Sequence, residues 1–168
     1  AAARALVVGT GALGSRIAEL LVRAGVGFLR LVDRDIVEVS NLPRQALFDE
    51  DDVAAGRPKA QAAAAHLGRI ARAARIDARV ADLHAGNVRD LMADVDGVLD
   101  GTDNLETRYL VNDAAVALGR PWIYGGVVET RGMVLPVHPG AGPCLRCVFP
   151  DPPGVGELPT CDTVGVLG

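Results

Sequence analysis

The chain has 168 residues, of which 49% are hydrophobic and 4% aromatic, and its formal net charge is −4 at pH 7. This length allows one domain whose core is built from Ala, Val, Leu and Ile rather than from rings, a composition that suits a parallel sheet covered by helices. The negative charge and the scattered basic residues exclude nucleic acid as the main partner, because duplex binding requires a clustered basic face.

The sequence also argues against membrane insertion and secretion. No stretch reaches the roughly 18 to 20 consecutive apolar residues that a membrane helix needs. Residues 1–4 lack the layout of a signal peptide. Three cysteines are too few for a disulfide scaffold and fit a reducing compartment. We therefore expect a cytoplasmic protein.

Short apolar runs alternate with segments of helical spacing along the chain. Gly25 and Gly119 follow two of the helical segments and are predicted to cap them, while Pro58 is placed to open a third. Between Ile36 and Arg57 the sequence is irregular and acidic, which predicts a loop with a short helical turn. We expect strands over 4–8, 28–32, 75–80, 97–99, 122–124 and 133–137, and helices over 14–24, 59–74, 87–93 and 105–118.

This alternation predicts the α/β fold class, with a doubly wound, mostly parallel Rossmann-like sheet and helices on both faces. A single domain is expected over 1–168, with an irregular, Pro- and Gly-rich region over 140–168. The first strand begins almost at residue 1, and 164–168 lacks a terminating element. We therefore expect a domain truncated at both ends within a longer protein.

A glycine turn separates the first predicted strand from the first helix. Gly9 permits the tight turn, Gly11 lets the backbone approach phosphate, and Gly14 lets the helix pack on the strand. The amides at the start of the helix would then face an anion. Asp33 ends the second predicted strand, where an acid commonly accepts hydrogen bonds from the ribose hydroxyls of NAD or ATP.

Polar residues after the second strand favour ATP over a dinucleotide. A dehydrogenase has no need for Asn41, Arg44, Gln45 and Lys59 at this point, whereas the charge of a triphosphate must be offset. Arg44 can make forked contacts with phosphate oxygens, and Lys59 can act as a compact point charge. The alternative is a solvated polar loop without a ligand.

Further acids follow the strand predicted at 97–99. Carboxylates at the carboxyl end of a parallel strand lie at the ligand edge of the sheet, and hard oxygen ligands suit a Mg²⁺ ion that bridges phosphates. Asp103 and Asn104 precede a predicted helix, so either could also cap it. We assign Asp103 to the metal and Asn104 to the cap.

These segments together resemble the adenylation domain of the MoeB/ThiF family, which is related to ubiquitin-activating enzymes. The resemblance covers nearly the whole chain, and its Ser-Asn-Leu-x-Arg-Gln element at 40–45 is quite specific. Ala12 departs from the family pattern, which more often has glycine there. The resemblance implies an ATP-binding adenylation domain over 1–168 in which Asp33 binds ribose, Asn41, Arg44 and Lys59 hold the triphosphate, and Asp103 binds magnesium.

The resemblance also implies a function and partners. It implies a homodimeric nucleotidyltransferase that adenylates the C-terminal glycine of a ubiquitin-like, β-grasp sulfur-carrier protein ending in Gly-Gly, with release of pyrophosphate. A carboxylate is already a competent nucleophile, so catalysis would reduce to positioning and charge neutralisation by Arg44, Lys59 and Mg²⁺ on Asp103. Two alternatives stay open, an NAD-dependent oxidoreductase and a non-catalytic scaffold that binds a ubiquitin-like partner.

The cysteines suggest a second type of site. Cys144 and Cys147 form a knuckle of the kind that binds structural zinc, but tetrahedral zinc takes four ligands, and a lone pair can also be without metal. The resemblance implies a second such pair beyond Gly168, so zinc is expected in the full-length protein and the site is incomplete in this chain. Cys161 resembles the cysteine of the family's mobile crossover loop, which in some members attacks the acyl-adenylate or receives sulfur. No base neighbours Cys161 in the sequence, so an unreactive thiol is equally compatible.

Overall fold

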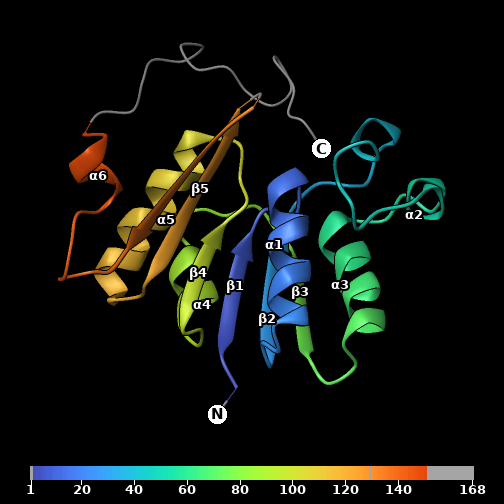
Figure 1. Ribbon diagram of the computed structural model, residues 1–168, viewed down its shortest axis with the longest axis horizontal. Coiled ribbons are helices and arrows are strands. Elements are labelled where there is room, and N and C mark those ends of the chain that lie inside the picture. The colour runs from blue at the N-terminus through green and yellow to red at the C-terminus, as the bar shows by residue number, and fades with distance from the viewer. Residues whose placement is uncertain (1, 129, 151–168) are drawn as a thin grey trace.

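The computed structural model describes residues 2–128 and 130–150 (Figure 1). Within them six strands form one sheet in the order β3-β2-β1-β4-β5-β6, and only the β5–β6 pair is antiparallel. The strands are β1 (Arg4–Val8), β2 (Phe28–Asp33), β3 (Arg75–Val80), β4 (Gly97–Asp100), β5 (Trp122–Val128) and β6 (Arg131–Val137). The helices are α1 (Ala12–Arg23), η1 (Val39–Asn41), α2 (Glu50–Ala54), α3 (Lys59–Ile70), α4 (Val88–Met92), α5 (Leu105–Leu118) and α6 (Leu145–Val148).

The predicted fold class is confirmed. From β1 the chain first adds strands on one side of the sheet, β2 and then β3, and afterwards on the other side, beginning with β4. The carboxyl ends of β1 and β4 therefore form the switch point, where ligands bind in such sheets. β5 and β6 are longer than expected because they pair continuously as a hairpin. The helix predicted to reach residue 74 ends at Ile70, since Arg75 must pair with the start of β2 and the chain turns to reach it. Among the described helices none has the length and apolar character to cross a membrane.

Helices cover the sheet from both sides (Figure 1). α1 and α3 pack on one face, where the alanines of α3 let it lie close to the strands. α4 and α5 pack on the other face around Trp122, the largest fully buried side chain. The two layers bury almost all of the side chains of β1, so the chain segments that follow β1 are held on a rigid support.

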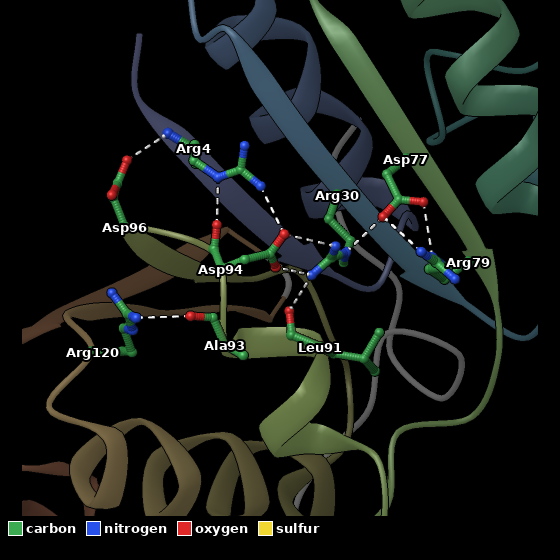
Figure 2. Close-up of polar contacts among 9 residues, drawn as sticks. All are labelled: Arg4, Arg30, Asp77, Arg79, Leu91, Ala93, Asp94, Asp96 and Arg120. Carbon is green, nitrogen blue, oxygen red and sulfur yellow. Dashed lines mark hydrogen bonds and ion pairs between the residues drawn. The ribbon is translucent and has the colours of Figure 1, made fainter. Parts of the chain in front are cut away.

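One charged side chain lies inside the second layer. Arg30 on β2 is 7% exposed, and its guanidinium bonds to Asp77 of β3 at 2.8 Å and to Asp94 at 2.6 Å (Figure 2). It also donates to the carbonyl of Leu91 at 2.8 Å, and Asp94 pairs with Arg4 of β1 at 2.7 Å. A buried charge must be paired and hydrogen-bonded. The network therefore ties the α4–β4 connection to three neighbouring strands.

This network predicts a pH-dependent contribution to stability. Burial alone would raise the pKa of Asp77, but hydrogen bonds from Arg30 and Arg79 lower it below its usual value. A carboxylate of this kind contributes above the pKa of the unfolded chain, about 4, and loses the contribution as pH falls through the folded pKa. We expect Asp77→Asn to lower the free energy of unfolding by about 1–3 kcal/mol at pH 7.

Urea unfolding from pH 7 to pH 2.5 measures this effect. The difference between wild type and Asp77→Asn should be constant down to about pH 5 and shrink below about pH 4. Asp90→Asn on α4 is the control, since it removes the same charge from an exposed position. A difference that stays constant to the lowest pH would contradict the role given to Asp77.

Candidate nucleotide-binding site

A large cavity lies at the carboxyl edge of the sheet, where the segments after β1, β2 and β4 meet. Its volume is about 1650 Å³, larger than the roughly 300–1,000 Å³ of a typical small-ligand site. Figure 1 shows the arrowheads of β1 and β4 pointing to this edge, where α1 begins. The cavity brings together most of the residues predicted from the sequence. Its lining includes Gly9, Gly11, Asp33, Asn41, Arg44, Lys59 and Asp103.

The glycine turn has the geometry predicted for it. Gly9 has a positive φ of 82°, which favours glycine. A Cβ on Gly14 would lie 1.9 Å from the carbonyl oxygen of Gly9, so the close packing of helix on turn requires glycine there. Gly11 is the N-cap of α1, and no side chain caps that end. The first amides of α1 are thus available to an anion from the cavity.

Asp33 holds the turn in place. Its carboxylate accepts from the backbone amide of Thr10 at 2.7 Å and from the Thr10 hydroxyl at 2.8 Å. Its other oxygen accepts from the amide of Asp35 at 2.9 Å. A carboxylate has about four acceptor positions, so these bonds leave capacity for a ribose hydroxyl. The structure therefore adds a structural role to the predicted ligand role of Asp33.

The two predicted cations reach the cavity from different elements. Lys59, the first residue of α3, is 7% exposed, and its Nζ lies 3.0 Å from the carboxylate of Asp35. Arg44 comes from the loop after η1 and donates to the carbonyl of Ser40 at 2.7 Å. The backbone of Lys59 is also held in place, because its amide donates to the Asp35 carbonyl at 2.8 Å.

Asn41 and Gln45 are buried at the same wall. The Asn41 side-chain oxygen accepts from the amide of Glu38 at 3.0 Å and caps η1, so Asn41 shapes the loop as well as lining the cavity. Gln45 lines the cavity, and its side-chain oxygen is buried without a hydrogen-bond partner in the described ranges. Such a group is normally satisfied by a ligand or by water. The wall is therefore suited to a polar ligand.

Asn104 caps α5 as predicted, while the metal role of Asp103 stays a prediction. The Asn104 side chain accepts from the amide of Thr107 at 2.9 Å and caps α5. Asp103 is exposed and lines the cavity. A carboxylate oxygen at this position is a ligand type that Mg²⁺ prefers, and phosphate oxygens and water would complete its octahedron. The residues present therefore fit the expected metal.

A buried ion pair lies directly behind this loop. Asp100, at the end of β4, is 1% exposed and accepts from the amide and hydroxyl of Thr102 at 2.8 and 2.6 Å. Arg108 of α5 donates to the same carboxylate at 3.1 Å. Burial raises the pKa of Asp100, and the nearby Arg108 and the bonds from Thr102 act against that rise.

Thr10, Asp35, Asp100 and Arg108 contribute to the site although the sequence alone predicts no role for them. Thr10 and Asp35 act through partners 23 and 24 positions away in the chain, whereas Asp100 and Arg108 bind one another eight positions apart. The signal available was position, since Asp35 and Asp100 occur at strand ends on the ligand edge of the sheet.

The Cys144–Cys147 knuckle borders the cavity through Arg146, which lies between the two cysteines. The two sulfurs are 3.7 Å apart, close to the edge of about 3.8 Å that Zn–S bonds of about 2.3 Å give in a tetrahedron. Burial alone would raise the pKa of the Cys144 thiol, but hydrogen bonds from Cys147 and the Arg146 amide lower it. The pair therefore fits half of a zinc site. Cys161, the predicted reactive cysteine, lies outside the described residues.

The region expected to be irregular contains an ordered helix in its described part. α6 docks on α5 because the buried amide of Leu145 donates to the Asn112 side chain at 2.9 Å. Arg146 pairs with Asp113 through two bonds of 2.7 Å. The prediction of an irregular segment missed these bonds, which anchor the knuckle through partners 33 positions earlier in the chain.

Fold and site together define a doubly wound α/β domain with a glycine turn and a cation-lined cavity at its switch point. The family model described as the ThiF family matches residues 1–168, and the chain belongs to that family. The predicted resemblance is thus confirmed at the level of the family.

Relatives and solved structures agree with this assignment. The chain is 47% identical to a sulfur carrier protein ThiS adenylyltransferase of Bacillus subtilis over 98% of its length, and it spans 48% of that protein. It is 43% identical to a sulfur carrier protein adenylyltransferase of Thermus thermophilus over 99% of its length, and it spans 62% of that protein. A crystal structure of E. coli MccB with ATP matches with a TM-score of 0.76 and 26% identity, over 88% of this chain and 45% of that one.

Two glycine substitutions should separate packing from ligand binding. Gly14→Ala forces a methyl group into backbone and should destabilise the fold by about 1–3 kcal/mol. Gly11→Ala meets only the Gln45 amide, at 3.8 Å, so the fold should be kept. Its methyl group would nevertheless lie between the backbone and a phosphate, and ATP affinity should fall at least about tenfold.

Thermal unfolding and calorimetric titration with ATP measure the two effects. Gly25→Ala is a poor control because of its positive φ, whereas Gly68→Ala on α3 is a matched control, since nothing lies within 4 Å of the added carbon. Equal ATP affinity of Gly11→Ala and Gly68→Ala would contradict the phosphate-binding role of the turn.

Proposed function

We propose that the protein carrying this domain is an ATP-dependent adenylyltransferase that activates the C-terminal glycine of a ubiquitin-like sulfur-carrier protein. The observation that carries the proposal is the convergence, in one cavity, of the uncapped start of α1, the cations Arg44 and Lys59, and the carboxylate of Asp103. A triphosphate needs amides and cations, and its magnesium ion needs an oxygen ligand. A dinucleotide would not require Arg44, Lys59 and Asp103 for its binding.

The comparisons support the reaction class. The two relatives described above are named for adenylation of a sulfur carrier, and the similar MccB structure contains ATP. The chain spans about half to three fifths of those relatives. The activity is therefore proposed for the whole protein, in which this domain supplies the nucleotide site.

In the proposed reaction, the terminal carboxylate of the carrier attacks the α-phosphorus of ATP. One carboxylate oxygen forms the new bond to phosphorus, the bond from the α-phosphorus to its bridging oxygen breaks, and pyrophosphate leaves with that electron pair. No proton is transferred, so no general base is required. The protein contributes by holding the phosphates with the amides of α1, with Arg44 and with Lys59.

Asp103 is proposed to hold Mg²⁺. The ion, when bound, neutralises charge that develops on the leaving phosphates. Asn41 and Asp33 would complete the nucleotide site, Asn41 beside the triphosphate and Asp33 at the ribose. Lys59 is paired with Asp35, so a bound phosphate would share the ammonium group with that carboxylate.

Cys144 and Cys147 are proposed to supply two zinc ligands in the full-length protein. Their sulfur separation and the docking of α6 on α5 support this, because the two sulfurs lie at the spacing of two ligands in a tetrahedral zinc site. The remaining ligands would come from a second cysteine pair outside this chain. A covalent role for Cys161 stays a prediction from the sequence.

We also propose that the protein is a homodimer that uses an open apolar surface of the sheet. On the face opposite α5, a groove of about 230 Å³ lies between α1 and the β5–β6 hairpin. Ile123 and Val134 share this face by register and are 42% and 71% exposed. Exposed apolar patches of this kind mark protein interfaces. Leu13, Ile17 and Leu99 complete the groove.

ATP–pyrophosphate exchange by the full-length protein tests the reaction. We expect exchange that depends on one Gly-Gly-ended β-grasp protein, and a loss of about 10²- to 10³-fold in Lys59→Met and in Asp103→Asn. Asp51→Asn is the control, because this exposed acid on α2 lies outside the cavity lining.

Each other outcome has a specific meaning. Full exchange by Asp103→Asn would show that the metal assignment is wrong. Tight ATP binding without exchange for any carrier would favour the scaffold, and binding of NAD in place of ATP would favour the oxidoreductase.

Light scattering after size exclusion tests the dimer. Val134→Asp places a charge in the apolar groove and should shift the protein to a monomer, with at least a tenfold weaker association. Val80→Asp is the matched control, since Val80 is 45% exposed on β3 at the opposite edge of the sheet. A Val134→Asp protein that stays dimeric would place the interface elsewhere.

A further inference from the structure

A buried arginine joins three separate segments behind the proposed nucleotide site. Arg108 lies in the first turn of α5, and its side chain is 11% exposed. Besides the carboxylate of Asp100, it donates to the carbonyl of Thr102 at 2.6 Å and to the carbonyl of Gly125 at 3.0 Å. Its guanidinium lies 5.0 Å from the ring centre of Tyr124. One side chain therefore links the end of β4, the loop after it, and β5.

The loop that carries Asp103 is attached on both sides. The Gly101 amide donates to the Val8 carbonyl at 2.8 Å, and Thr102 is bound to Asp100 through its amide and hydroxyl. Asn104 is fixed as the cap of α5. Asp103 lies between these anchored residues and faces the cavity. The backbone before Asp103 depends on Arg108, because Arg108 bonds to both Asp100 and the Thr102 carbonyl.

These contacts suit positioning rather than direct binding. The cavity lining includes Thr102, Asp103 and Thr107 but not Arg108, whose bonding groups are turned toward the protein. Mg²⁺ demands near-ideal octahedral geometry, so its ligand must be placed accurately. A displacement of about 1 Å in a site of this kind can cost about 10²-fold in rate.

We propose that Arg108, through its bonds to Asp100, Thr102 and Gly125, is a positioning residue that fixes the magnesium-binding loop of the adenylation site. The proposal rests on the proposed function and names a residue on which magnesium binding at this site depends. Arg108 is absent from the residues that line the cavity, so this role does not involve direct contact with the nucleotide. Its planar guanidinium donates hydrogen bonds to a carboxylate and to two carbonyls at once, a pattern that the single ammonium of lysine does not reproduce.

The test is the magnesium dependence of Arg108→Met and Arg108→Lys in the full-length protein. We expect the Mg²⁺ concentration for half-maximal exchange to rise at least about tenfold in both variants, and kcat to fall by about 10²-fold in Arg108→Met. ATP affinity measured in EDTA should change less than about threefold, since the α1 amides, Arg44 and Lys59 are untouched. A merely structural residue would lower the folded fraction without changing the magnesium dependence.

Arg120→Met is the matched control. Arg120 follows α5 at its other end and also donates to a backbone carbonyl, that of Ala93 at 2.8 Å (Figure 2). Its magnesium dependence should equal that of wild type. If Arg108→Met does not fold, Arg108→Lys keeps a charge beside Asp100 and carries the test, read on protein that unfolds cooperatively.

The outcomes separate this inference from the proposed function. Wild-type magnesium dependence in folded Arg108→Lys and Arg108→Met would overturn the positioning role while leaving adenylation intact. A wild-type protein without magnesium-dependent exchange would overturn the proposed function itself, and this inference with it. A raised magnesium requirement that is equal in the Arg108 and Arg120 variants would also overturn the positioning role.

Discussion

Close backbone contact among three glycines determines how tightly the chain segments pack at the ligand edge of this sheet. Gly9 and Gly14 belong to the turn between β1 and α1, and Gly101 follows β4. A Cβ on Gly101 would lie 2.6 Å from the Gly14 Cα and 2.7 Å from the Gly9 carbonyl oxygen. Backbone therefore packs directly on backbone where the strand order reverses. The start of α1 and the Asp103 loop form neighbouring walls of the cavity because no side chain separates them.

Three acidic side chains at this edge form hydrogen bonds or ion pairs with other groups of the protein. Asp33 is bound by Thr10 and by the amide of Asp35, Asp35 by Lys59, and Asp100 by Thr102 and Arg108. Such bonds reduce the repulsion that a polyphosphate would meet. Asp103 differs, since no hydrogen bond of its side chain occurs in the part of the chain that the structure describes. A carboxylate without such bonds has its oxygens available to a cation that lies between the protein and a phosphate.

The sequence predicted the strands and the glycine turn, and most of the site residues that it singled out do line the cavity. These features depend on local periodicity and on the rule that parallel strands end at one edge. It did not predict the pairs Asp35–Lys59 and Asp100–Arg108, or the network around Arg30. Arg30 and Asp77 are 47 positions apart and meet only through the β2–β3 register. Side-chain pairing of this kind depends on packed geometry, which composition and spacing do not contain.

The two edges of the sheet differ in how they meet other strands. β3 forms one edge, and Arg75, Asp77 and Arg79 give it alternating charges along its length. Charged side chains on an edge strand oppose the addition of a further strand. β6 forms the other edge and carries Met133 and Val134, which are 50% and 71% exposed. Addition of a further strand is thus opposed at the β3 edge, whereas the β6 edge leaves two apolar side chains exposed to solvent.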